Sequence, residues 1–152
     1  MSIRMIFTNS KKPAAPLIRL LTWSDFSHVA VLMNEYEIVH ADFSGVHVEP
    51  LKDLQSRSKN WMIVEYECED PKAVIDACLT QVGKPYDFSG LVGIVFRDID
   101  LQDDSKWWCS EFPMYGSMVA NWPTFNVDYI HRLTPQHWLM LPHIIIASGT
   151  NQ

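Results

Sequence analysis

The sequence predicts an α+β domain in which an antiparallel sheet packs against a few helices. β-Rich runs come before the segments that carry helical signals. Separate groups of strands and helices are typical of α+β architecture. The chain has 152 residues, of which 47% are apolar, and this suits a single domain over residues 1–152 with a sizeable core.

The predicted strands are short β-rich runs separated by brief turns. Residues 28–34 and 38–43 flank a short connection, so they are predicted to pair as a hairpin. A third run covers residues 46–48. Residues 61–68 alternate in polarity, with Ile63 on the more polar face. The apolar face of this predicted strand consists of Met62, Val64, Tyr66 and Cys68.

The predicted helices follow from capping residues and helical stripes. Asp70 and Pro71 suit the N-cap and the first helical position. Gly83 ends the apolar stripe that follows. That stripe consists of Val74, Ile75, Cys78, Leu79 and Val82. A further helix is predicted to begin after Cys109 and to run to about Asn121.

Charge and composition exclude several classes of function. The net charge is −6 and the basic residues form no long run, which argues against binding to nucleic acid or to anionic lipid. No apolar segment reaches the length of about 18 residues that a membrane span needs. Residues 1–21 lack the pattern of a signal peptide, and three cysteines without a CxxC pair favour reduced thiols. We therefore expect a cytoplasmic protein of bacterial or phage origin.

Cys109 is the candidate nucleophile. It precedes a predicted helix, where unpaired N–H groups and the positive end of the helix dipole stabilise a thiolate and lower the thiol pKa. The backbone N–H of Cys109 itself can donate to an oxyanion. The alternative is a small buried hydrophobe, which is the usual role of a free cysteine. Cys68 and Cys78 lie on apolar stripes and are predicted to take that second role.

Two histidines are the candidate partners of this thiol. His28 opens one predicted strand, and His40 lies on the neighbouring strand of the hairpin. A cysteine nucleophile needs an imidazole beside it, and that imidazole needs a further group to orient it. His40 and Asp42 are both candidates for the orienting group. The other histidines have no comparable setting and are expected to be structural or surface residues: His47, His131, His137 and His143.

The sequence resembles the circularly permuted papain-like cysteine hydrolases, YiiX-like relatives of the NlpC-type peptidases and of the lecithin–retinol acyltransferase-like proteins. The likeness runs from about Ser27 to Leu141. It is carried by segments in a fixed order, with the histidines before the cysteine. These segments are Ser27-His28-Val29-Ala30-Val31, Ile38-Val39-His40-Ala41, Gly83-Lys84-Pro85-Tyr86-Asp87-Phe88-Ser89-Gly90 and Trp108-Cys109-Ser110-Glu111.

The resemblance implies a permuted papain-like fold and a Cys109-His28-His40 triad. The expected reaction is hydrolysis of an amide or isopeptide through a thioester on Cys109, as in an amidase or peptidase. Tyr86 becomes a candidate for binding the oxyanion or the substrate, with a core aromatic as the alternative. Trp108 and Ser110 flank the nucleophile and are further candidates for substrate contact. No cofactor or metal is expected.

Three alternatives remain open. A lipid-directed acyltransferase or thioesterase would use the same triad on a lipid ester. A zinc site built from one thiolate and two imidazoles is chemically possible, although no closely spaced CxxC or HxxxH pair supports it. A catalytically silent binding module or effector would keep the fold and lose the reactive thiol.

Overall fold

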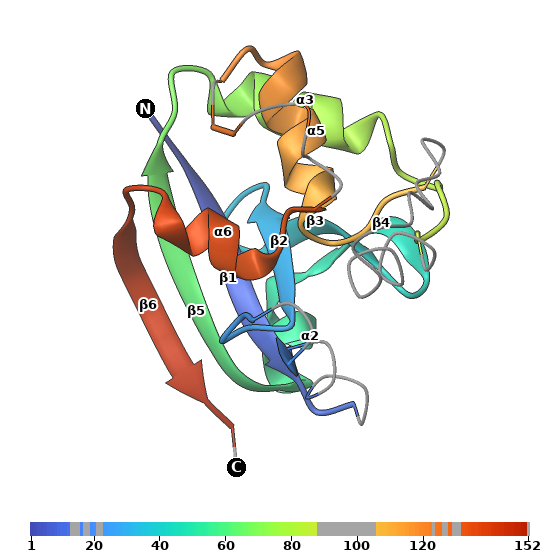
Figure 1. The fold of residues 1–152 in the computed structure, drawn as a ribbon, viewed down its shortest axis with the longest axis vertical. Coiled ribbons are helices and arrows are strands. Elements are labelled where there is room, and N and C mark those ends of the chain that lie inside the picture. Colours follow the sequence, from blue (N-terminus) through green and yellow to red (C-terminus); the bar gives the residue numbers. More distant parts are fainter. Residues whose placement is uncertain are drawn as a thin grey trace.

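The computed structural model describes residues 1–12, 16, 19–20, 23–87, 106–122, 124–125, 128 and 132–151. Its centre is one antiparallel sheet with the strand order β4-β3-β2-β1-β5-β6 (Figure 1). The strands are β1 (Ser2–Ser10), β2 (His28–Leu32), β3 (Glu37–Asp42), β4 (Gly45–Pro50), β5 (Ser58–Glu67) and β6 (Ile144–Thr150). This arrangement with its helices confirms the predicted α+β class.

Helices cover both faces of the sheet. The main core packs between one face and the helices α3 (Pro71–Leu79), α5 (Glu111–Val119) and α6 (Pro135–Met140). The short helix α2 (Leu51–Ser56) packs on a smaller core that contains Ala30, Ile38 and Ile63. Within the part of the chain that the structure describes, no helix is long and apolar enough to cross a membrane.

Several predicted elements are confirmed. β2 and β3 pair as the expected hairpin, and β4 covers the third predicted run. In β5 the predicted apolar face lies in or against the main core. Asp70 caps α3 by accepting a hydrogen bond of 2.9 Å from the Ala73 backbone N–H, and Pro71 is the first helical residue. α5 begins after Cys109, as predicted, and ends at Val119.

Other features of the fold differ from the sequence-based expectation. β1 and β6 were not predicted as strands, yet β1 pairs with β2 and β5 in the middle of the sheet, and β6 pairs with β5 at its edge. Ile63 is 8% exposed, because the α2 layer gives the second face of β5 its own core. Both differences depend on packing partners that are distant in the sequence.

Candidate active site

Cys109 lies directly before Ser110, the N-cap residue of α5, and only 2% of it is exposed. Its Sγ atom is 4.0 Å from the carbonyl oxygen of Ser27 and 3.8 Å from the hydroxyl of Ser110. The backbone N–H of Val29 also donates to the thiol. The thiol therefore lies beside the backbone of residues 27–29, whose central residue is His28.

β2 and β3 separate near this thiol. Their backbone pairing joins Val31 to Val39 and Leu32 to Ile38. The thiol contacts β2 at Val29, two residues before Val31. The described pairing between β2 and β3 does not extend to this end of β2. Cys109 belongs to the core on the α5 side, whereas the strand alternation places His28 with Ala30 on the α2 side. Both groups nevertheless lie at the same end of β2, because the thiol contacts Ser27 and Val29, the two neighbours of His28.

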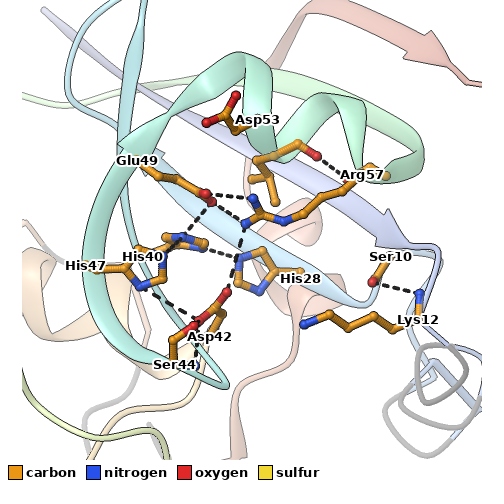
Figure 2. Close-up of polar contacts among 12 residues, drawn as sticks. Ser10, Lys12, His28, His40, Asp42, Ser44, His47, Glu49, Asp53 and Arg57 are labelled. Atoms are coloured by element: carbon orange, nitrogen blue, oxygen red, sulfur yellow. Dashed lines mark hydrogen bonds and ion pairs between the residues drawn. The ribbon is translucent and has the colours of Figure 1, made fainter.

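His28 and His40 contact each other across the separated strands. Nε2 of His28 lies 2.7 Å from Nδ1 of His40, and the rings meet edge-on (Figure 2). His40 is fully buried, and His28 is partly exposed. Among the described residues, neither imidazole makes a hydrogen bond to the Cys109 thiol, whose contacts are with Ser27, Val29 and Ser110.

A carboxylate and a guanidinium anchor the buried imidazole. Nε2 of His40 lies 2.9 Å from Oε1 of Glu49, which stands on β4. Arg57, between α2 and β5, binds both oxygens of Glu49, with 2.6 Å between Nη1 and Oε2. This fork fixes the carboxylate plane, because two parallel hydrogen bonds hold it from one side. Nε2 of His47 lies 3.2 Å from Nε2 of His40.

These contacts assign a tautomer to each of the three imidazoles. The Gly45 carbonyl oxygen lies 3.1 Å from Nδ1 of His47, so this nitrogen carries the proton and Nε2 accepts. The Glu49 carboxylate only accepts, so Nε2 of His40 carries its proton. Nδ1 of His40 then accepts from Nε2 of His28. Nδ1 of His28 keeps its lone pair, which is what a general base requires.

Burial keeps the thiol and the first imidazole neutral. Burial raises the pKa of Cys109 to about 11, against the lowering effect of the Ser110 side chain and of the N–H groups of Val29, Cys109 and Ser110. Although part of His28 is exposed, desolvation of its ring and the neighbouring His40 lower the pKa of His28 to about 3. The lowered thiol pKa expected from the helix N-terminus is therefore wrong for this structure, because desolvation outweighs the hydrogen bonds.

A cavity of about 70 Å³ lies against the imidazole pair on the α2 side. His28, His40 and Arg57 line it, together with Ser27 and Tyr86. The described lining does not include Cys109, but the carbonyl of Ser27 touches the thiol. Ser27 thus separates the cavity from the sulfur of Cys109.

Comparisons with known proteins identify the family. The family model described as the permuted papain-like amidase enzyme, YaeF/YiiX, C92 family matches residues 4–127. The chain belongs to this family. Its predicted YiiX-like resemblance and its permuted papain-like fold are confirmed. No curated protein gives a significant match.

Among solved structures, the C92 chain is similar to the metalloprotein YiiX from Escherichia coli O157:H7. The TM-score is 0.71 at 17% sequence identity, and the alignment covers 99% of this chain and 98% of that chain. At this identity the likeness supports the fold. Amidase chemistry comes from the description of the family.

Tyr86 is held close to the segment that contains Cys109 in this C92 chain. Trp107 donates from its backbone N–H to the Pro85 carbonyl at 3.2 Å, and Asp87 donates to the Trp107 carbonyl at 3.0 Å. Burial raises the pKa of Tyr86, as does a negative charge on Cys109 or Asp42, so the phenol keeps its proton. The protonated hydroxyl can donate a hydrogen bond.

The other predicted site residues have different environments. Trp108 is 1% exposed and packs in the main core, and Ser110 is fully buried, with its carbonyl accepting from the Trp138 indole at 2.9 Å. Asp42 accepts hydrogen bonds of 2.8 Å from the backbone N–H and the hydroxyl of Ser44. It makes no hydrogen bond to His28 among the described residues, whereas His40 does.

Sequence reasoning missed part of the polar cluster. His47 was expected to be structural or on the surface, but it contacts His40; Glu49 and Arg57 were not considered. A usable signal was the pairing of β3 with β4, which sets His40 opposite His47. His131 and residues 88–90 of the predicted tyrosine segment lie outside the described residues.

One group of side chains in the cluster has the donors of a metal site. One ligand atom from each of His40, Asp42 and His47 lies within 4.8 Å of the others. Two imidazoles and a carboxylate are donors that zinc accepts. Nη2 of Arg57 lies 3.9 Å from Oδ2 of Asp42, so a positive charge already faces this group.

Proposed function

We propose that the protein is a cysteine amidase in which Cys109 forms a thioester with the acyl part of an amide substrate. The observation that carries the proposal is the His28–His40 contact of 2.7 Å beside the segment that touches the Cys109 thiol. The family description supplies the amide substrate class. A reducing compartment such as the cytoplasm suits the three free thiols.

In the proposed reaction, His28 moves one proton in each half. Nδ1 of His28 takes the thiol proton as Sγ attacks the amide carbon, and an oxyanion forms. The C–N bond then breaks, and His28 gives this proton to the leaving amine. In the second half, water attacks the thioester and gives a proton to His28, which returns it to the departing sulfur. The products are the acid and the amine.

The oxyanion is proposed to bind to the Cys109 backbone N–H and the Tyr86 hydroxyl. Tyr86 keeps its proton because burial raises its pKa, and its backbone bridges to Trp107, two residues before Cys109. Donors held rigidly before the reaction stabilise the developing charge without reorganisation. Ser110 and Trp108 then hold the nucleophile segment, and they act through its position.

His40 is the proposed orienting group. It fixes the tautomer of His28 through Nδ1 and is fixed in turn by Glu49 through Nε2. Glu49 stays charged because hydrogen bonds from His40 and Arg57 outweigh burial and lower its pKa to about 2. The negative charge of Glu49, at the end of this series of hydrogen bonds, stabilises the imidazolium that forms when His28 takes the proton.

The test is hydrolysis of a panel of peptide, isopeptide and lipid-ester substrates by the wild type and by Cys109→Ala. Cys68→Ala is the matched control, because it also removes a buried thiol. We expect amide hydrolysis that Cys109→Ala abolishes and Cys68→Ala retains. Full activity in Cys109→Ala would refute the proposal. Turnover of lipid esters alone would favour the acyltransferase alternative.

Metal binding is a second candidate function. The solved neighbour YiiX is described as a metalloprotein, and His40, Asp42 and His47 supply suitable donors. Bound zinc would supply a Lewis acid. Because His40 takes part in both arrangements, metal binding would compete with its hydrogen bond to Glu49. Zinc titration by calorimetry should show stoichiometric binding that His47→Ala removes and His143→Ala retains; no binding by the wild type would exclude this function.

A further inference from the structure

The cavity beside the imidazole pair contains a cation that lacks a carboxylate partner. Lys12 lines this cavity together with His28 and Phe43. Figure 2 shows its side chain extending toward His28 and Asp42 from the end of β1. Its Nζ lies 5.3 Å from the centre of the Phe43 ring, a cation–π contact that holds the ammonium at the cavity. Among the described residues, it forms no ion pair.

The carboxylates of the cavity region are already neutralised by other groups. Asp42 accepts from Ser44 and lies 3.9 Å from the Arg57 guanidinium. Glu49 is held by the fork from Arg57 and by His40. The positive charge of Arg57 is thereby compensated by carboxylates of the protein. The positive charge of Lys12 would have to be compensated by a negative charge on a bound group.

The hydroxyl groups around the cavity are also engaged within the protein. Ser58 donates to the Leu54 carbonyl at 2.7 Å, and Ser27 donates to the Thr8 carbonyl at 3.3 Å. Ser10 accepts at 3.1 Å from the backbone N–H of Lys12, which fixes the start of the lysine side chain. Of the lysine, arginine and carboxylate groups in the described lining, the Lys12 ammonium is thus the one that forms no ion pair.

We infer that this amidase acts on substrates that carry a carboxylate close to the scissile amide, and that Lys12 binds this carboxylate. The inference rests on the proposed function and adds the substrate class. The overall charge of −6 repels acidic molecules, so a local cation at the cavity is needed to select them. A volume of about 70 Å³ accepts a group as small as an aspartate side chain.

The binding test uses the C-terminal amides of N-acetylaspartate and N-acetylasparagine. These two compounds are nearly equal in size, and only the first carries a carboxylate. Their affinities are measured by NMR titration of wild type, Lys12→Met and the matched control Lys11→Met. Both lysines are exposed, but only Lys12 belongs to the described cavity lining. We expect the wild type and Lys11→Met to bind the aspartate compound about tenfold more tightly. We expect this preference to disappear in Lys12→Met.

A kinetic test uses matched peptide amides with Asp or Asn next to the scissile bond. The ratio of their kcat/KM values should fall about tenfold in Lys12→Met and stay constant in Lys11→Met. Equal binding of the paired probes by the wild type, or a preference that survives in Lys12→Met, would overturn the inference. Charge-selective binding without any hydrolysis would support the carboxylate site and refute the amidase proposal, so the two failures are distinguishable.

Discussion

Nε2 of His28 lies 2.7 Å from Nδ1 of His40, although the two residues are not direct cross-strand partners. The observed pairing of Val31 with Val39 would place His28 opposite Asp42 if it continued. The imidazoles are therefore diagonal neighbours on one face, a spacing that long and aromatic side chains can bridge. Because the described ladder ends before His28, its ring can lean toward His40 and leave Nδ1 for proton transfer.

This diagonal contact predicts which residue orients His28. We expect His40→Asn to lower kcat by about 10²-fold, because the tautomer and the position of the base are then no longer fixed. Asp42→Asn should change kcat by less than about threefold, since Asp42 binds Ser44. Steady-state kinetics on one peptide amide checks both values. A large loss in Asp42→Asn with a small loss in His40→Asn would assign the orienting role to Asp42.

The buried thiol predicts slow alkylation in the absence of substrate. With a pKa of about 11, Cys109 holds little thiolate at pH 7, so its reaction with iodoacetamide should be at least about tenfold slower than that of an exposed thiol. The rate should rise with pH toward 11. Mass spectrometry of the alkylated peptides measures it, with a free cysteine peptide as reference. Fast alkylation of Cys109 below pH 7 would contradict a neutral Cys109 thiol in the enzyme without substrate.

Glu49 predicts a pH-dependent contribution to stability. Its pKa falls from the usual 4.5 to about 2 in the folded protein, so ionised Glu49 stabilises the fold above pH 4.5, and this contribution is lost as the pH falls toward 2. Glu49→Gln should therefore lower the free energy of unfolding by about 1–3 kcal/mol at pH 7, where Arg57 loses its charged partner. The gap to wild type should close between pH 4.5 and 2, as measured by urea denaturation. A gap of constant size across this range would show that the charge of Glu49 is not its cause.

Gly116 predicts a stability effect that depends on close helix packing. A Cβ at this position would lie 2.7 Å from Sγ of Cys78 and 2.9 Å from the Val74 carbonyl oxygen. Gly116→Ala should destabilise the fold by about 1–3 kcal/mol, although alanine favours helix formation. Chemical denaturation of Gly116→Ala and of the double variant with Cys78→Ala measures it. The double variant should recover only part of the loss, because the carbonyl contact remains; a stabilising Gly116→Ala would contradict this packing.

The sequence predicted the elements whose signals are local. Asp70 and Pro71 began a helix where expected, because an N-cap side chain and a fixed proline φ act within one turn. β1 was missed because its place between β2 and β5 depends on partners far along the chain. β6 was missed for the same reason, because its pairing with β5 is likewise non-local.

In the candidate site too, features with local signals were predicted, and features that depend on distant parts of the chain were missed. His28 and His40 were chosen because a hairpin brings them near each other, and the structure does so. Glu49 and Arg57 were missed because their fork depends on the turn from β4 through α2, which no short motif marks. The thiol pKa of Cys109 was misjudged because a helix N-terminus is visible in sequence, whereas burial is a property of the assembled core.

Trapping the acyl-enzyme tests directly whether Cys109 is the nucleophile. A slowly hydrolysed activated amide is incubated with wild type, His28→Ala and Cys109→Ser, and the proteins are examined by intact mass and peptide mapping. We expect a single acyl adduct on Cys109 in the wild type, strongly delayed in His28→Ala and absent as a thioester in Cys109→Ser. Amide turnover without an adduct on Cys109, or an adduct on Cys68 or Cys78 in its place, would contradict Cys109 as the nucleophile.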